Sequence, residues 1–214
     1  MIVKWYGHSS FLLTSESGGK VLIDPYGKFL GYRMPSLQAD IVAVTHDHRD
    51  HNHVQVVEGG YVLVNEPRQY ELEHAVIYGI STFHDNVGGK KRGENTVFVF
   101  EIDGLRLCHL GDLGHLPTAE QLEQIGKIDV LFVPVGGTRT LDGAHGAETV
   151  RLIKPQIAIP MHYRTEALGF AGKVLFHRVE PFIQDSGLPV HRVQELNFTK
   201  ENVTDYQGIV LMEY

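Results

Sequence analysis

Three histidines and two aspartates lie within six residues, in the segment His46-Asp47-His48-Arg49-Asp50-His51. Imidazole nitrogens and carboxylate oxygens are good ligands for Zn²⁺ and for neighbouring divalent cations. In an extended loop, residues two apart can place His46 and His48 on one ion. Asp50 and His51, on the turn that follows, can face a second ion. A solvated charged loop would not be expected to contain so many metal-competent residues, so the segment predicts a site for two metal ions.

Further residues that can bind metal follow later apolar segments. His84 comes after residues 75–80, Asp112 after residues 105–110, and His162 after residues 156–160. Asp24 likewise follows the apolar segment 20–23. Loops at the ends of strands, held by a rigid sheet, are common places for chemistry. Each of these residues alone is more often structural, but their shared position at strand ends favours a common site.

The pattern His-x-His-x-Asp-His, which residues 46–51 match without departure, resembles the signature of the metallo-β-lactamase superfamily. The resemblance covers most of the chain, because the later motifs occur in the same order. It implies two ions and a bridging carboxylate: His46, His48 and His84 for one ion, Asp50, His51 and His162 for the other, and Asp112 between them. By the same resemblance, Asp24 supports the metal loop without binding metal.

Such a site would carry out hydrolysis. Two cations about 3.5–4 Å apart lower the pKa of a shared water, so that metal-bound hydroxide exists at neutral pH and attacks a carbonyl or phosphorus centre. The expected cofactors are two divalent ions per chain, with zinc first and manganese or iron as alternatives. The predicted catalytic residues are Asp50, Asp112 and His115, the last as a residue that contacts substrate or protonates a leaving group.

Several residues near the expected site leave a structural and a functional interpretation open. His8 follows the first expected strand and His115 follows the expected bridge, so both belong near the metal edge. Asp142 and His145 occupy a loop that lines the pocket in the functional interpretation. Asp47 either accepts a hydrogen bond from a metal-binding histidine or is a solvated loop residue.

Other residues are expected to be structural. His109 lies in an expected strand and is predicted to pack in the core. Surface or packing roles are expected for the remaining histidines: His53, His74, His177 and His191. The loop 88–93 contains three basic residues between glycines that indicate mobility. An ordinary solvated turn is favoured slightly there over a loop that attracts an anionic substrate.

Hydrophobic periodicity predicts strands and helices in mixed order. Strands are expected at residues 2–6, 10–14, 20–23, 41–44, 61–64, 75–80, 96–102, 105–110, 130–135, 156–160 and 208–212. Helices are expected at residues 117–125, 147–153 and 181–185, and Pro67 suits the first turn of another. The resemblance implies an α/β fold, a four-layer αβ/βα sandwich of two mixed β-sheets flanked by helices. No flexible linker divides the chain, so residues 1–214 are expected to form one domain.

Composition restricts partners and location. A formal net charge of −7 argues against a nucleic-acid binder, which needs a basic face. No segment approaches the roughly 20 apolar residues that span a bilayer, and no signal peptide is recognisable. The single cysteine, Cys108, is predicted to lie in the core, and a cytoplasmic location is expected. The expected partner is a small-molecule substrate, and an exposed strand at residues 208–212 would support a homo-oligomer.

The Gly7-His8-Ser9-Ser10 start, the Ile23-Asp24-Pro25 motif and the compact length resemble one branch of the superfamily. That branch contains small zinc-dependent hydrolases, including ascorbate-6-phosphate lactonase-like and N-acylphosphatidylethanolamine phospholipase D-like proteins. This kinship implies hydrolysis of a phosphoester or lactone bond in a small anionic metabolite. The alternatives are a thioesterase or other ester hydrolase of the same fold, and a non-catalytic metal-binding scaffold. Every ligand position is filled, which favours an enzyme.

Overall fold

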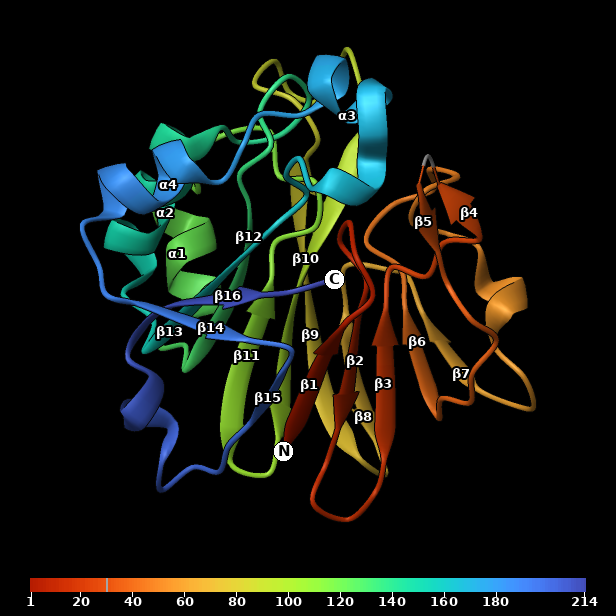
Figure 1. The fold of residues 1–214 in the computed structure, drawn as a ribbon. Helices are drawn as coiled ribbons and strands as arrows, with labels where there is room; N and C mark the ends of the chain where they lie inside the picture. The colour runs from red at the N-terminus through yellow and green to blue at the C-terminus, as the bar shows by residue number, and fades with distance from the viewer. Residues whose placement is uncertain (30) are drawn as a thin grey trace.

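Two mixed β-sheets form the middle of the molecule (Figure 1). The computed structural model describes residues 1–29 and 31–214. The first sheet has the order β15 (Glu195–Asn197), β1 (Ile2–Trp5), β2 (Phe11–Thr14), β3 (Lys20–Ile23), β6 (Ile41–Ala43) and β7 (Val62–Val64). The second has the order β14 (Val190–Val193), β16 (Gly208–Met212), β13 (Ile157–Met161), β12 (Val130–Pro134), β11 (Leu105–His109), β10 (Glu94–Ile102), β9 (Ala75–Phe83) and β8 (Gln69–Leu72). A short hairpin of β4 (Lys28–Phe29) and β5 (Tyr32–Arg33) forms a separate sheet.

The main hydrophobic core lies between the two sheets. The rings of Phe11 in β2 and Phe132 in β12 meet there at a centroid distance of 4.5 Å. Successive side chains of a strand point to opposite faces of its sheet. In β3, accordingly, Val21 and Ile23 belong to the main core, whereas Leu22 belongs to a second apolar cluster on the outer face. Both faces of the sheet are therefore covered at β3 and β6, which explains why these two strands are apolar at consecutive positions.

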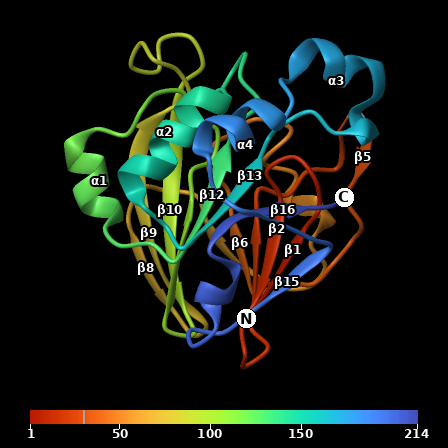
Figure 2. The same ribbon diagram turned by 60° about the vertical axis from the view of Figure 1, so that its left-hand side comes forward.

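Helical segments lie outside both sheets and complete the four predicted layers. Three helices cover the second sheet: α1 (Ala119–Ile125), α2 (Gly143–Ile153) and α4 (Glu180–Ser186) (Figure 2). Outside the first sheet are α3 (Gly169–Leu175) and the one-turn helices Val54–Val56 and Glu166–Leu168. Val56 and Leu168 of the one-turn helices, and Phe176 directly after α3, pack in one cluster with Leu22 and Val42 of the first sheet. One further short helix, Val203–Tyr206, precedes β16.

Two expectations from the sequence are wrong. Pro67 lies in a bend, where Arg68 N donates to Glu66 O, and strand β8 follows directly instead of a helix. Strand β16 is not exposed, because it lies between β13 and β14 with all five residues buried. It therefore offers no free edge for a symmetric interface. In addition, α2 begins at Gly143, four residues before its predicted start.

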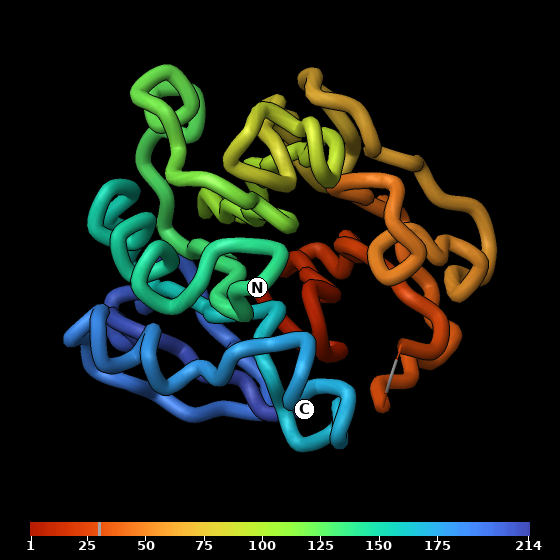
Figure 3. Tube along the Cα trace, turned by 90° about the horizontal axis from the view of Figure 1, so that it is seen from above, coloured from red at the N-terminus to blue at the C-terminus, as the bar shows by residue number. Residues whose placement is uncertain are grey.

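The loops that carry the candidate residues meet at one end of the sheets. Strands β3 and β6 are parallel, so their C-terminal ends lie at the same edge. Strands β11, β12 and β13 are parallel to one another. Strand β9 points the same way, because β9 and β11 are both antiparallel to β10. The turn between β1 and β2 lies at this end too, because β1 is antiparallel to β2, which is antiparallel to β3. Seen from above, loops from widely separated parts of the chain converge there (Figure 3).

Candidate metal centre and adjacent cleft

Asp112, three residues after β11, lies at the centre of a cluster of histidines. Its Oδ2 atom lies near the Nε2 atoms of four histidines: 3.1 Å from His162, 3.2 Å from His84, 3.4 Å from His51 and 4.0 Å from His46. Asn95 fixes the backbone at this point, because its Oδ1 accepts from Asp112 N at 2.9 Å and its Nδ2 donates to Leu110 O at 3.0 Å. Histidines from the ends of three strands, β6, β9 and β13, thus converge on the carboxylate that follows β11.

The cluster contains separate groups of side chains suited to metal ions. The ligand-type atoms of His46, His48 and His84 all lie within 4.8 Å of one another. So do those of a second set, His46, His51 and Asp112, and those of a third, His8, His51 and His162. Asp50 adjoins the third set, with its Oδ2 atom 3.9 Å from His51 Nε2. The structure thus brings together all the residues that the sequence suggested as ligands, and adds His8.

Unpartnered buried atoms in this cluster fit a divalent cation. Among the described residues, His46 Nε2, His51 Nε2 and Asp112 Oδ1 are buried and make no hydrogen bond. Buried polar atoms without partners are rare in folded proteins, and each one calls for an explanation. Imidazole nitrogen and carboxylate oxygen are together a typical ligand set for zinc and similar ions. The side chains present therefore fit a metal centre.

Asp24, directly after β3, orients the loop that carries the histidine motif. Its carboxylate accepts hydrogen bonds from Thr45 N at 2.8 Å, from Thr45 Oγ1 at 2.8 Å and from His51 Nδ1 at 2.9 Å. Because a carboxylate only accepts, Nδ1 of His51 carries a proton, which leaves Nε2, directed at Asp112, as the nitrogen that can bind a metal. Asp47, by contrast, is exposed and accepts from Asn52 Nδ2 at 2.7 Å, which makes it a loop residue.

Burial and charge set the protonation of the cluster without an ion. Burial lowers the pKa of His46 to about 3, so its ring is neutral at neutral pH. Burial would also lower the pKa of His51, but Asp112 and Asp24 outweigh it and raise that pKa well above its ordinary value. Burial opposes ionisation of Asp112, whereas the charges of His162 and His51 hold its pKa well below the usual range. A cation that binds here would replace the proton of His51.

Three residues at the site have left-handed backbone conformations. His8, Asp24 and His162 have φ angles of 53°, 46° and 56°. Positive φ is uncommon for residues other than glycine, although His and Asp are among the types that tolerate it. Such conformations cluster at functional sites, where the surrounding structure maintains them. All three occur directly after or near the ends of β1, β3 and β13.

A cleft with a volume of about 500 Å³ opens beside His84. It is lined by basic residues from four loops and from the first turn of α2: Lys91, Arg92, His115, Arg139, His177 and His145. Lys91, Arg92 and Arg139 form no ion pair with any residue in the described part of the chain. Of the two acids that line it, Asp142 is 2.8 Å from His145 Nδ1 and caps α2, and Asp85 is occupied by backbone donors. His177, for which a surface or packing role is expected, is exposed and also lines this cleft.

Asp85 holds the basic loop next to the cleft. Its two carboxylate oxygens accept from the backbone N–H groups of Val87, Gly89, Lys91 and Arg92 at 2.8–2.9 Å. Desolvation would raise the pKa of Asp85, but these bonds lower it to about 2. The bonds restrict a loop in which the glycines alone indicated mobility. They also place Lys91 and Arg92 at the wall of the cleft.

The remaining candidate residues have defined local partners. His115 lines the cleft, and its Nδ1 donates to Leu116 O at 2.8 Å while its Nε2 accepts from Phe83 N at 3.3 Å. His109 is fully buried and bonds Ser9 O through Nε2, which confirms its predicted place in the core. Cys108 is also buried, and burial raises the pKa of its thiol.

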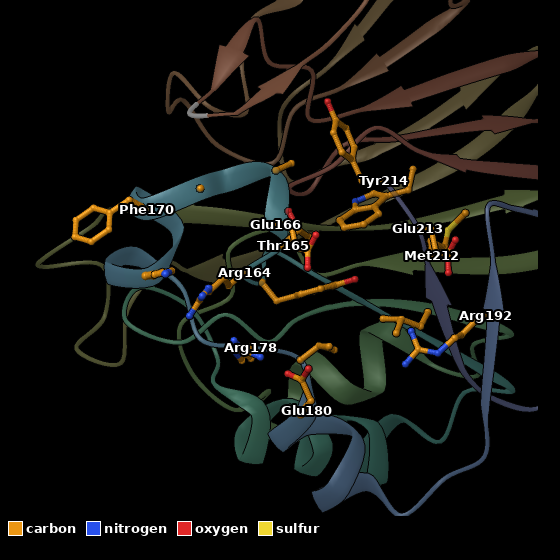
Figure 4. A pocket seen from close by; sticks show the side chains of 17 residues that line it. Arg164, Thr165, Glu166, Phe170, Arg178, Glu180, Arg192, Met212, Glu213 and Tyr214 are labelled. Atoms are coloured by element: carbon orange, nitrogen blue, oxygen red, sulfur yellow. The ribbon is translucent and has the colours of Figure 1, made fainter.

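A larger cavity of about 910 Å³ lies between α3 and the strands β14 and β16, and contains none of the clustered histidines (Figure 4). Its wall includes Tyr163 and Arg164, which follow His162 in the chain. Its charges nearly balance, with Arg164, Lys173, Arg178 and Arg192 against Glu166, Glu180 and Glu213. This cavity is therefore separate from the metal centre.

No helix in residues 1–29 and 31–214 combines the length and apolar character needed to cross a membrane.

Known proteins resemble this chain over most of its length. The model of a family described as the beta-lactamase superfamily domain matches residues 2–162. A UPF0173 protein of Pyrococcus abyssi is 29% identical over 206 residues, which cover 86% of this chain and 96% of that protein. A UPF0173 metal-dependent hydrolase of Thermococcus onnurineus is 29% identical over 191 residues, covering 76% and 84%. A crystal structure from Thermotoga maritima, described as that of a Zn-dependent hydrolase of the metallo-beta-lactamase superfamily, has 35% identity and a TM-score of 0.81, with 99% and 98% covered.

Proposed function

Because the chain belongs to the beta-lactamase superfamily and is a metal-dependent hydrolase, we propose that it cleaves a phosphoester or lactone bond in a small anionic metabolite. The histidine and aspartate cluster would hold two divalent ions, with zinc as the first choice and manganese or iron as alternatives. When bound, such a pair of ions makes hydroxide available at neutral pH and neutralises charge on the reacting oxygens.

The side chains divide into two sets around Asp112. His46, His48 and His84 would hold the first ion, and Asp50, His51 and His162 the second, with Asp112 between them. The distances from Asp112 Oδ2 to the histidine Nε2 atoms, from 3.1 to 4.0 Å, support this division. A second observation supports ion binding here: His46 Nε2, His51 Nε2 and Asp112 Oδ1 are buried and make no hydrogen bond among the described residues.

The unpaired basic residues of the cleft carry the proposal of an anionic substrate. The protein as a whole has a formal net charge of −7, yet Lys91, Arg92 and Arg139 line one cleft next to His84 and pair with no acidic group among residues 1–29 and 31–214. Unpaired Arg and Lys side chains that converge on one site are suited to phosphate or carboxylate groups. Thr138 helps to hold Arg139 in place, because its hydroxyl donates to Leu175 O at 2.7 Å.

His115 is the proposed proton donor to the leaving group. It lines the same cleft, and its Nε2 accepts a hydrogen bond from Phe83 N–H. The ring has to give up this hydrogen bond before Nε2 can carry a proton and donate it to the leaving group. A general acid must come within hydrogen-bond reach of the leaving atom in the complex with substrate.

Hydrolysis rates across classes of substrate test the reaction. Phosphodiesters, phosphomonoesters, lactones and thioesters would be compared with the zinc-, manganese- and iron-loaded protein, using Asp112→Asn as the inactive variant. We expect Asp112→Asn to lower the rate at least about 100-fold, because changes to residues that merely support ligands already cost 10–100-fold. The control is Asp47→Asn, in the same segment but exposed, which should keep its rate. A preference for thioesters would contradict the proposed substrate class, and no hydrolysis by fully loaded protein would favour a scaffold.

Arg139→Gln tests the recognition of the anion. The variant should raise KM for an anionic substrate about tenfold, equivalent to about 1.4 kcal/mol, and leave a neutral analogue unaffected. Arg192→Gln is the matched control, because Arg192 lines the separate larger cavity and forms no ion pair with a described residue. Equal effects on the charged and neutral substrates would show that the cleft does not recognise charge.

A further inference from the structure

His8 lies in the tight turn between β1 and β2, at the same end of the sheets as the metal centre. Only 1% of its surface is exposed, and its backbone has a φ angle of 53°. Its carbonyl oxygen accepts two hydrogen bonds, from Trp5 Nε1 at 3.1 Å and from His162 N at 3.1 Å. The backbones of His8 and His162 are therefore joined directly, although the residues belong to different sheets.

The ring of His8 contacts the side chains proposed to hold the second ion. Its centroid lies 4.3 Å from the ring of His162 and 5.0 Å from that of His51. Phe29 covers another side of the ring at a centroid distance of 4.6 Å. The imidazole is thus fixed by packing, and solvent does not reach it.

The polar contact of this ring is with Asp50. His8 Nε2 lies 3.2 Å from Asp50 Oδ2. Asp50 is less buried than its partner, since a quarter of its side chain remains exposed. Other than this bond and the neighbouring His51, no described side chain is close enough to orient the Asp50 carboxylate. Because an ionised carboxylate only accepts, the bond requires a proton on Nε2 of His8.

We propose that His8 is a positioning residue of the metal centre, whose Nε2–H donates to Asp50 and fixes that carboxylate for the second ion. This inference rests on the two-ion site of the proposed function. Residues that hydrogen-bond to metal ligands orient them and strengthen binding, and Asp24 performs the same service for His51. The second ion thereby depends on a residue from the first turn of the chain. The opposing assignment is His8 as a direct ligand together with His51 and His162, whose ligand-type atoms lie within 4.8 Å of one another.

Zinc binding by His8→Ala and His8→Gln separates these assignments. Both dissociation constants would be measured by competition with a chromophoric chelator, and total zinc by elemental analysis. We expect His8→Ala to bind the first ion as the unaltered protein does and the second 10–100-fold more weakly. His8→Gln should recover most of that affinity, because its amide N–H can donate to Asp50. His53→Gln, at an exposed histidine of the neighbouring loop, is the control and should change neither constant.

Each outcome distinguishes between the possibilities. If His8→Gln binds the second ion as weakly as His8→Ala, the side chain acts as a ligand and the positioning role is wrong. If His8→Ala loses thermal stability but keeps both zinc constants, His8 is structural only. Unaltered protein that binds two ions and hydrolyses substrate would uphold the proposed function in either case. Unaltered protein that binds a single ion would overturn both the two-ion site and the role of His8.

Discussion

At the scale of single residues, Asp24 shows how the fold maintains a charge in its interior. The side chain is fully buried, and a buried charge without partners would cost several kcal/mol. Three donors, two from Thr45 and one from His51, satisfy its two oxygens. Desolvation alone would raise the pKa of Asp24, but the charge and hydrogen bond of His51 lower it below the ordinary value. Asp24 therefore stays ionised and fixes the orientation of His51.

Asp24→Asn is expected to weaken zinc binding by roughly 10–100-fold and to lower the melting temperature of the metal-free protein. An asparagine has a single acceptor oxygen, so its NH₂ group would face either Thr45 N–H or His51 Nδ1–H. Chelator competition and thermal denaturation measure the two effects. Asp47→Asn serves as the comparison, since its exposed carboxylate contacts only Asn52 among the described side chains. Unchanged zinc affinity in Asp24→Asn would show that His51 is oriented by other contacts.

The sequence predicts those residues of the metal centre whose types and positions form a recognisable pattern. The histidine motif and the aspartates after strands could be identified because their residue types and positions form a pattern. The contact of His8 with Asp50 could not, because it joins residues 42 positions apart through the packing of a turn against a loop. The same holds for the cleft, where Lys91, Arg139 and His177 come from separate loops whose geometry depends on the whole fold.

At the scale of elements, the loop after β9 depends on a single carboxylate. Asp85 replaces the hydrogen bonds that a regular element would provide, by accepting from four backbone N–H groups between Val87 and Arg92. A compact loop with positive φ at Gly88 and Gly89 then positions two basic side chains at the cleft. The order of this loop is therefore expected to depend on the ionisation of Asp85.

Acid titration of metal-free protein tests this dependence. The pKa of Asp85 is lowered in the folded state from 3.8 to about 2. The stability that it contributes is therefore complete above about pH 4 and is lost as the pH falls through about 2. Asp85→Asn should be less stable than the unaltered protein at pH 7, and the difference should shrink between pH 4 and pH 2. Urea unfolding at several pH values measures this difference, and a gap that stays constant with pH would exclude the role of the charge.

The elements that were predicted correctly are those with a strong local pattern. Strands such as β12 and β13 are buried at every position and stand out as apolar segments. Strand β14, which was not predicted, lies at an edge and has no buried residue, so its sequence carries little periodic signal. Pro67 suits the first turn of a helix and so predicts one, but the pairing of β8 with β9 determines the local structure.

At the scale of the whole molecule, the metal centre joins the two sheets. Asp24, His46 and His51 follow strands of the first sheet, whereas His84, Asp112 and His162 follow strands of the second. An ion bound between them would connect the layers at the end where the loops meet. Bound ions stabilise the folded state in proportion to the logarithm of their concentration relative to Kd.

Removal of metal is expected to lower the melting temperature. At free zinc about 100 times Kd, one site contributes about 2.7 kcal/mol. For a chain of this size, 1 kcal/mol corresponds to about 2–4 °C, so the expected decrease is about 5–11 °C. Differential scanning calorimetry with and without chelator measures it, and chelator already saturated with zinc is the control. An identical melting temperature in both states would mean that the ions do not bind across the sheets.

The pairing of β1 has a consequence for the time at which the first sheet is completed. Ile2 in β1 pairs with Asn197 in β15, and the amino group of Met1 donates to Phe198 O at 2.9 Å. During synthesis on the ribosome, the nascent chain has to keep this edge of β1 unpaired until Asn197 has emerged. An unpaired strand edge can template the wrong partners, and pairing between distant segments slows folding. The closing of β15 onto β1 should therefore be the last step in completing the first sheet, because the other strands of that sheet end by Val64.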